Sequence, residues 1–590
     1  MRPLAVALGL VGAALVVASP VKAGIQLFPG VTYESGVQFT PHGPVAIHIV
    51  RGPRPVGLYH LRPALSNESV LGRETVSSME RRLASQATAV GVNGDYFSVA
   101  DGRPSGIVMR DGVLVSPPSS DRSSVGVGLD GTMDVRRVEL SGAWQGLGQR
   151  RRLNTFNREP AANAIALFTS DWGPSTPRIP GAVSVVLSPF PATAPNVDLS
   201  GTVADIRQGS VAPIAPGTAV LVARGTAAEK LVAEAPLGET VTVQLTLPPE
   251  WASVTDAIGG GPVLVRDGLP VLHANELFTS SQLAPRAPRT AVGQLASGRI
   301  LLVAVDGRQP GYSIGMTTFE LAQTMVRLGA VRAMALDGGG STTLAFDGSV
   351  LNDPSDGRER SVSTALMLLY SGVYAPPPRE SVLSPNGDGI ADRQMLSYKV
   401  VRPSTVTVTL TAPDGSTAFE ETLERDPGTY DVPFPIVPPA GSTPPFEPVL
   451  PTPTPDGRWA LAVTSTDEEA QRSTAVRRFW VNSTLGYLRV QPRTLVLPPA
   501  GGRNATVSWS QERAGRVVVT LESKSGIAVR RIASRRFEPG VASVVWNGRL
   551  KGGRLPFGGM YRIRVAARNE VGTVSLDEPL RIRRVATPRK

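Results

Sequence analysis

The chain lacks cysteine altogether, and histidine is scarce. Its 590 residues contain no Cys and only four His, at positions 42, 48, 60 and 273. The missing thiols exclude disulfide scaffolds, thiolate metal centres, iron–sulfur clusters and cysteine nucleophiles. So few imidazoles also disfavour a metal cage built from several histidines. We therefore expect no cofactor and no metal centre, with a divalent cation held by carboxylates as the open alternative.

Long apolar runs are absent after the N-terminus. Arg2 precedes an apolar stretch from Leu4 to Ser19, and small residues stand at Val21 and Ala23, just before Gly24. This pattern is typical of a secretory signal peptide, because a membrane-spanning helix needs about 20 apolar residues. The alternative is a single membrane anchor. We predict that residues 1–23 are removed, that no transmembrane segment is left, and that the protein is secreted or bound to a bacterial cell wall.

Glycine and proline are abundant, with 61 and 53 residues, which indicates a turn-rich and β-rich chain. A proline triplet at 376–378 closes a first region, 24–374. Beyond it, short strands of period two predict two β-sandwich modules, 375–485 and 486–590. The first of these modules carries a proline-dense insertion at 433–455, which predicts an extended loop.

Positive charge is unevenly distributed along the chain. The net charge of +11 first suggests a nucleic-acid partner. However, residues 1–374 carry +1 and residues 375–485 carry −5, whereas residues 486–590 carry +15. The nearly neutral first region and the predicted export argue against nucleic acid. We predict that the module 486–590 binds an anionic cell-envelope polymer. A solvated arginine-rich surface without a partner is the alternative.

Two apolar stretches, 300–305 and 331–336, each end in an aspartate followed by glycine. Asp306 follows the first and Asp337 the second. Residues 317–329 between them start with a capping box and end at a glycine, which predicts a helix. A strand, a helix and a strand in succession predict a right-handed crossover and two parallel strands. The two aspartates would then share one sheet edge, where open α/β sheets bind ligands.

The turn after Asp337 consists of Gly338, Gly339, Gly340, Ser341 and Thr342. Successive glycines let main-chain N–H groups approach a ligand closely, and the hydroxyls add donors. No lysine follows, which excludes a Walker A loop, and the spacing of a serine-hydrolase elbow is absent. A tight connection without function is the alternative.

Polar side chains also follow or open two further apolar strands. Asn93 and Asp95 follow the run at 89–92, and they could hold sugar hydroxyls or transfer protons. The alternative is an Asx turn. Arg289 opens the strand at 289–293, and a cation entering a buried strand is costly unless it is paired. We predict an anion clamp at Arg289, with a structural salt bridge as the alternative.

Taken in order, these motifs resemble the phosphodiester glycosidase family. The resemblance rests on Asn93-Gly-Asp-Tyr-Phe97, Arg289-Thr-Ala-Val-Gly293, Asp306-Gly-Arg308 and Asp337-Gly-Gly-Gly-Ser-Thr342, and segments at 154–176, 311–315 and 352–360 are similar as well. It spans roughly residues 80–370. One departure is Asp95, where many members have glycine. The resemblance implies an α+β domain, with a mixed sheet and crossover helices, that cleaves a sugar-1-phosphodiester.

This chemistry suggests roles for the residues. A phosphate leaves readily, so positive charge at the phosphate and a carboxylate near the anomeric carbon matter most. The candidate catalytic residues are Asp337, Asp306 and Asp95, with Asp337 or Asp306 as base or nucleophile. The candidate substrate-binding residues are Asn93 for sugar hydroxyls, Arg289 and Arg308 for the phosphate, and Gly338, Gly339, Gly340, Ser341 and Thr342 around it.

The C-terminal modules also resemble a known type. Residues 545–565 are similar to the immunoglobulin-like module of flagellar hook-capping proteins, and Asn386 with Asp388 has either Ca²⁺-compatible or Asx-turn spacing. We predict an α+β domain followed by two all-β immunoglobulin-like sandwiches. The predicted function is a secreted glycosidase acting on an N-acetylglucosamine-type phosphodiester in an exopolysaccharide or cell-wall glycan. The alternative is a noncatalytic carbohydrate-binding or surface adhesion protein.

Overall fold

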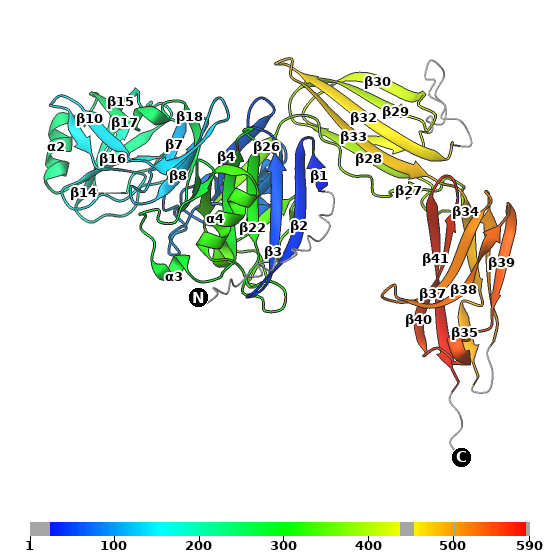
Figure 1. Cartoon of the computed structure of the whole chain (residues 1–590). Helices are drawn as coiled ribbons and strands as arrows, with labels where there is room; N and C mark the ends of the chain where they lie inside the picture. The colour runs from blue at the N-terminus through cyan, green and yellow to red at the C-terminus, as the bar shows by residue number, and fades with distance from the viewer. Residues whose placement is uncertain (1–23, 210, 437–453, 499–502, 586–590) are drawn as a thin grey trace, which may run out of the picture. The chain divides into compact units, whose positions relative to one another are not determined.

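Strands dominate the molecule and helices are few. The computed structural model describes residues 24–209, 211–436, 454–498 and 503–585, and the chain divides into two compact units, 1–371 and 372–590 (Figure 1). The predicted signal peptide and most of the proline-dense insertion, 437–453, lie outside the described residues. Within those ranges no helix has both the length and the apolar surface to cross a membrane.

An eight-stranded sheet forms the centre of the first unit, and every neighbouring pair in it is antiparallel. In sheet order its strands are β1 (Ile25–Phe28), β2 (Val31–Thr40), β3 (Gly43–Gly52), β22 (Ile300–Val305), β21 (Arg289–Leu295), β23 (Ala330–Leu336), β19 (Val263–Arg266) and β20 (Leu269–Pro270). Helix α4 (Thr318–Arg327) begins at the capping box of Thr317 and Glu320 and packs Leu321 and Met325 into the core of this sheet.

The two aspartates emerge at one edge of the central sheet, as predicted. Strands β22 and β23 run in the same direction, because β21 lies between them and is antiparallel to both. Asp306 follows the end of β22, and Asp337 follows the end of β23. Arg289, the first residue of β21, pairs with Val305 at this same edge. The central sheet is therefore antiparallel throughout. The mixed pairing that we expected occurs in another sheet of this unit, where residues 155–156 pair in parallel with residues 166–167.

The second sheet of the first unit consists of five antiparallel strands. Its strands are β25 (Ser349–Val350), β24 (Leu344–Phe346), β5 (Thr88–Asn93), β26 (Thr364–Tyr370) and β4 (Tyr59–Leu65), and α1 (Val76–Leu83) packs on it. Strand β24 pairs with β5. The glycine-rich turn after Asp337 thus connects β23 of the central sheet to β24 of the second sheet, beside the end of β5.

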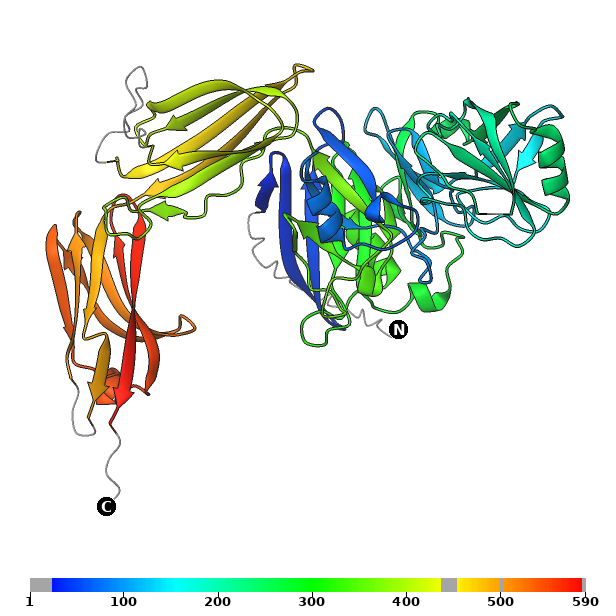
Figure 2. The same ribbon diagram turned by 180° about the vertical axis from the view of Figure 1, so that it is seen from behind.

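The segment between residues 106 and 262 forms two further sheets around a shared core, drawn in cyan and green in Figures 1 and 2. One sheet contains β11 (Arg151–Leu153), β10 (Ser141–Gln145), β17 (Thr240–Thr246), β15 (Asp198–Gln208), β14 (Ala182–Leu187), β16 (Ala219–Arg224), β13 (Ile165–Thr169) and β12 (Thr155–Phe156). The other contains β7 (Val113–Ser116), β6 (Val108–Arg110), β18 (Val254–Gly259), β8 (Ser123–Gly128) and β9 (Met133–Arg137). Helix α2 (Thr226–Glu234) packs Leu231 into this core.

The second unit contains two pairs of sheets, and each pair encloses one apolar core. The first pair is β27 (Val382–Leu383), β33 (Arg472–Val481), β32 (Gly457–Asp467), β29 (Ser404–Thr411) and β30 (Thr417–Arg425), facing β28 (Gln394–Val400) and β31 (Gly428–Phe434). The second pair is β34 (Leu485–Gln491), β36 (Ala505–Gln511) and β39 (Gly540–Trp546), facing β35 (Thr494–Leu497), β41 (Thr573–Arg584), β40 (Gly559–Arg568), β37 (Gly515–Ser523) and β38 (Ala528–Phe537). Their immunoglobulin-like identity stays a prediction.

The loop before β28 takes the Asx-turn alternative. Asn386 Oδ1 accepts the N–H of Asp388 at 3.1 Å, and Asp388 Oδ1 accepts the N–H of Ile390 at 2.8 Å. These oxygens therefore close the loop on its own main chain, which is the ordinary use of such side chains in turns.

Candidate active site

Asp337 lies at the junction of the central sheet and the second sheet, where β23 leads to β24. Its N–H donates to the Gly94 carbonyl at 3.0 Å, and its own carbonyl accepts the Asn93 side-chain amide at 2.7 Å. Loss of hydration raises the pKa of Asp337 to about 6, and the charge of Asp95 adds to the shift, whereas Ser341, Gly338 and Arg360 oppose it. The residue is half-buried, so a ligand can still reach it. A carboxyl that titrates near neutral pH in such a place is a candidate base or nucleophile.

The glycine-rich turn offers two donors beside Asp337. The N–H of Gly339 donates to the Pro288 carbonyl at 2.9 Å, and that of Ser341 to Gly338 at 3.3 Å. Among the described residues, no main-chain acceptor is found for the N–H of Gly340. The buried Ser341 hydroxyl lies close enough to the Asp337 carboxyl to lower its pKa, but it has no hydrogen bond of good geometry with any described residue. Buried polar groups are rarely left unpaired, so these two groups are candidates for contact with a ligand.

Two guanidinium groups flank this turn. Arg308 lies beside Gly339, where an added Cβ would come within 3.2 Å of its Nη2 atom. Arg308 is exposed, has a positive φ of 60° and makes no hydrogen bond or ion pair with any described residue. Arg360 lies against Gly340, where a Cβ would collide with it, and it pairs with Asp356 at 2.6 Å. A phosphate above the turn would meet positive charge from both sides.

Arg289 has partners other than those predicted. Its guanidinium donates to the carbonyls of Met316, Gln282, Leu283 and Pro285 at 2.8 to 3.3 Å. Burial lowers its pKa. Its donors are thus committed to the main chain around α3 (Ser280–Leu283), which it fixes at the sheet edge. The role of anion clamp fits Arg308 and Arg360 better, and Arg360 was not singled out from the sequence.

Asp306 is enclosed by donors and is not free to react. Its buried carboxylate accepts from His48 Nε2 at 2.8 Å, Tyr312 Oη at 3.0 Å, Asn352 Nδ2 at 3.0 Å and the Asp353 N–H at 3.1 Å. Asn352 also donates to the carbonyl of Thr342 at 3.2 Å. The carboxylate oxygens are therefore occupied. These contacts favour a positioning role for Asp306 at the glycine-rich turn, and its role as base or nucleophile stays a prediction.

Asn93 is buried away from any sugar. Its Oδ1 atom accepts the Thr290 hydroxyl at 2.7 Å and the Thr343 N–H at 3.1 Å, while its amide holds the carbonyl of Asp337. It is fully buried. The prediction that Asn93 holds sugar hydroxyls is replaced by a structural role: it ties β5, β21 and the turn together.

Asp95 is also out of reach of a sugar. It is 1% exposed, and its Oδ1 atom accepts the N–H of Tyr96 at 2.8 Å. Its Oδ2 atom has no partner among the described residues and lies against the backbone of Gly106 and Gly259, where no Cβ would fit. Burial raises the pKa of Asp95, and Arg122 opposes the shift. Asp95 therefore acts on Asp337 through its charge. The glycine run at 259–261, which makes this burial feasible, was missed in the sequence.

Tyr96 and Phe278 form an apolar wall beside the Asp337 carboxyl. Their ring centroids are 5.5 Å apart, and the Tyr96 hydroxyl donates to the Gly261 carbonyl at 3.3 Å. Burial raises the pKa of Tyr96, with Asp337 as the next cause. Rings of this kind give the CH face of a sugar an apolar surface to pack on. Phe278 lies in a mainly polar loop, so its position carried no sequence signal.

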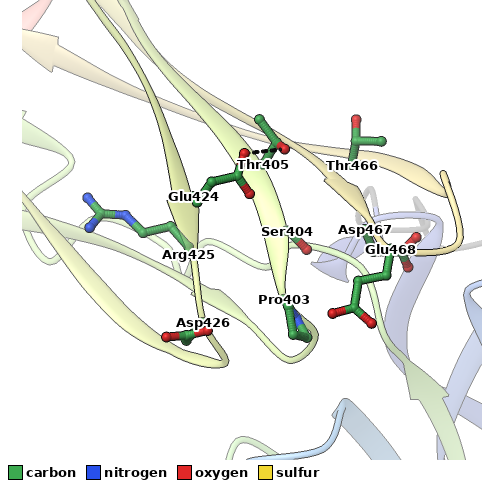
Figure 3. A pocket seen from close by; sticks show the side chains of 9 residues that line it. All are labelled: Pro403, Ser404, Thr405, Glu424, Arg425, Asp426, Thr466, Asp467 and Glu468. Atoms are coloured by element: carbon green, nitrogen blue, oxygen red, sulfur yellow. Dashed lines mark hydrogen bonds between the residues drawn. The ribbon is translucent and has the colours of Figure 1, made fainter.

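A pocket in the second unit holds no comparable arrangement (Figure 3). It is lined by residues 403–405, 424–426 and 466–468. Glu424 accepts the Thr405 hydroxyl at 2.7 Å, as the dashed line shows, and Asp467 accepts from Arg402 at 3.3 Å. Glu424 and Asp467 thus form hydrogen bonds at the ends of strands β29, β30 and β32. In the described part of the chain, no three His, Asp or Glu side chains are placed to hold a metal ion.

The structure thus defines a β-rich domain with an acid of raised pKa at a sheet edge, beside a glycine-rich turn flanked by arginines. Residues 194–369 match the family model described as phosphodiester glycosidase. The match includes Arg289, Asp306 and Asp337.

Individual relatives give shorter or looser matches. The chain is 36% identical over 107 residues to the SPbeta prophage-derived uncharacterized protein YomE of Bacillus subtilis, which is 18% of this chain and 16% of that protein. It is 38% identical over 68 residues to the N-acetylglucosamine-1-phosphodiester alpha-N-acetylglucosaminidase of Bos taurus, 12% of each chain. A crystal structure of a hypothetical protein from Synechocystis matches with a TM-score of 0.50 and 26% identity, over 60% of this chain and 64% of that one. The chain thus spans only a small part of the two curated relatives.

Proposed function

We propose that the first unit hydrolyses a sugar-1-phosphodiester. The observation that carries this proposal is Asp337, with its pKa raised to about 6, beside a turn flanked by Arg308 and Arg360. The ionised carboxylate either takes a proton from a water molecule that attacks the anomeric carbon, or attacks that carbon itself and is then released by water. The two guanidiniums and the Gly340 N–H hold the phosphate, which leaves as a monoester. Positive charge fixed at the leaving group stabilises the negative charge that develops there.

The proposed substrate is an N-acetylglucosamine-type phosphodiester in an exopolysaccharide or cell-wall glycan. The aromatic wall of Tyr96 and Phe278 supports a sugar ring next to Asp337. The N-terminal pattern of residues 1–23 supports export to the cell surface. The alternative is a protein that only binds the glycan, and turnover separates the two.

The test is release of free sugar and phosphate monoester from N-acetylglucosamine 1-phosphate methyl diester by the purified full chain. Because Asp337 acts in its ionised form, kcat/KM should rise with pH through about 6 and then level off. Binding of the diester without any product would favour the alternative.

Asp95→Asn should move the rise of kcat/KM with pH, the acidic limb of the pH profile, to lower pH. Removing a neighbouring negative charge makes the ionised form of Asp337 easier to reach, so the pKa of Asp337 falls. The pH profile of kcat/KM measures the shift. Asp101→Asn is the matched control, since Asp101 belongs to the same chain segment but has no part in the Asp337 shift. A limb that stays at about 6 in Asp95→Asn contradicts this role.

We further propose that the last module binds an anionic envelope polymer. On the outer face of its five-stranded sheet, Arg516 of β37 stands directly between Arg568 of β40 and Arg536 of β38. Arg564 and Arg531 occupy a second row on the same face. Like charges directly opposite one another destabilise a sheet. A polyanion lying across the rows would relieve this repulsion.

Replacing Arg516, Arg531 and Arg568 by serine should lower the salt concentration at which the protein elutes from immobilised teichoic acid. The matched control replaces Arg152, Lys230 and Arg266, three exposed cations of the first unit, and so has the same net charge. Salt screens the attraction of both variants to the polymer, but only the first variant loses the arginine rows of the last module. Equal elution of the two variants would show that net charge alone holds the protein.

A further inference from the structure

A cluster of three arginines surrounds Asp95. Burial lowers the pKa of Arg158, and the charges of Arg103 and Arg122 lower it further, while Asp95 opposes them. Arg122 Nη1 lies 3.4 Å from Asp95 Oδ1. Arg103 lies 3.8 Å from Asp101, and among the described residues Asp95 is the one acid within ion-pair distance of Arg122, while Arg158 has none. Positive charge therefore exceeds negative charge in a place with little water, which is unfavourable unless an anion joins it.

Arg158 has a donor with nothing to bind. Its Nη2 group donates to the carbonyl of Ser105 at 2.8 Å. Its Nε atom is buried and finds no acceptor anywhere in the described residues. An arginine presents five donors in a fixed fork that matches phosphate or carboxylate oxygens. The unused Nε–H points to an oxygen ligand that comes from outside the chain.

A pocket of about 420 Å³ opens at this arginine. Arg158 lines it together with residues 117, 118, 120, 138–140 and 154–156. Ser120, Asn154 and Thr155 supply polar groups suited to sugar hydroxyls, and two prolines and a leucine supply apolar walls. The lining also includes the exposed side chain of Glu139, whose carboxylate suits sugar hydroxyls and not the phosphate. The volume lies in the range of small-molecule sites, about 300–1,000 Å³.

Arg122 is near both Arg158 and the aromatic wall of the candidate active site. It follows Ser120 of the pocket wall by two positions, and its charge lowers the pKa of Arg158. Its guanidinium lies 5.0 Å from the centre of the Tyr96 ring. The charge of Asp337 raises the pKa of Tyr96.

We propose that the pocket at Arg158 is a second anion subsite, which binds the next phosphate of a substrate whose sugars are linked by repeated phosphodiesters. The substrate class is thus a polyanionic glycan and not a single capped sugar. This inference rests on the proposed function. It assigns Arg158 and Arg122 to the phosphate, and the polar wall of the pocket to the sugar next to it.

The test compares ligands by calorimetry on the full chain carrying Asp337→Asn, which prevents turnover. The probes are N-acetylglucosamine 1-phosphate methyl diester and a synthetic oligomer with three phosphodiester-linked N-acetylglucosamine units. The oligomer should bind at least about tenfold more tightly than the monomer. Arg158→Gln should remove this gain, as should Ser120→Trp, which fills the pocket without changing its charge. Arg152→Gln, on the nearby strand β11 but outside the pocket, should keep it.

Each outcome decides between the two proposals. Equal binding of monomer and oligomer, or a gain that survives both pocket variants, overturns the subsite but leaves the proposed function intact. Binding of neither probe overturns the proposed function itself. An oligomer of uronic acids that gains as much as the phosphodiester oligomer overturns the assignment of phosphate to Arg158.

Discussion

Asp337→Asn should lower kcat for a sugar-1-phosphodiester by about 10²–10⁴-fold or more, with no loss of thermal stability. The asparagine is isosteric, and the main-chain hydrogen bonds of residue 337 to Gly94 and Asn93 remain. It cannot act as a base or nucleophile. Steady-state kinetics with N-acetylglucosamine 1-phosphate methyl diester measure the loss, and Asp347→Asn, an exposed turn residue ten positions later, is the control.

The raised pKa of Asp337 determines whether Asp337→Asn raises or lowers the melting temperature. Folding raises this pKa from 3.8 to about 6, so the folded chain disfavours the charged form. The stability contributed by the neutral form is therefore present below pH 4 and is lost as the pH rises to about 6. At pH 7 the variant should melt at the same temperature as the unchanged protein or above it, and at pH 4 this difference should shrink. Full turnover, or a large fall in melting temperature, contradicts the assignment.

Arg308→Ala and Arg360→Ala should each lower kcat/KM by about 10²–10³-fold, as expected when one group that stabilises transition-state charge is removed. Both guanidiniums flank the turn, at Gly339 and Gly340. The melting temperature should change little, because the pair of Arg360 with Asp356 is exposed and such pairs contribute at most about 1 kcal/mol. Kinetics and inhibition by inorganic phosphate measure the effect.

Arg358→Ala is the matched control for the clamp, since Arg358 is an exposed arginine of the same loop. Its kcat/KM should stay near that of the unchanged protein. Arg289→Ala separates the two assignments of the phosphate site. It should lower the melting temperature, because four main-chain carbonyls lose their donor. A loss of phosphate affinity without any loss of stability in that variant would return the clamp to Arg289.

The position of the site could be predicted from the sequence, whereas the roles of several residues could not. Two apolar runs of strand length and one capped helix were enough to bring Asp306 and Asp337 to one edge. The role of Asp306 depends on His48, Tyr312 and Asn352, which are far apart in the chain and meet only after folding. A carboxylate with its oxygens taken and one with its oxygens free look the same in a sequence.

The roles of Arg289 and Arg360 could not be predicted from the sequence either. Arg289 stands at the start of a buried strand and suggested a clamp, but the main-chain carbonyls of Met316 and of the segment 282–285 just before it take its donors. Arg360 ends the segment 352–360, which carries part of the family resemblance, but nothing in the sequence assigns it a role at the phosphate, although the chain folds it against Gly340. Burial raises the demand for partners, and the fold alone decides which partner arrives.

The turn that carries Asp337 is also the passage from one sheet to another. Strand β23 pairs within the central sheet, whereas β24 pairs with β5 in the second sheet. A small slip between the two sheets would move the Asp337 carboxyl relative to Arg360, which lies four residues before β26 of the second sheet, while the strand pairing within each sheet stayed intact. Catalysis should therefore fail under mechanical or thermal stress before the fold does. To make the activity more resistant to heat, new contacts between the central and the second sheet should help more than stabilising either sheet alone.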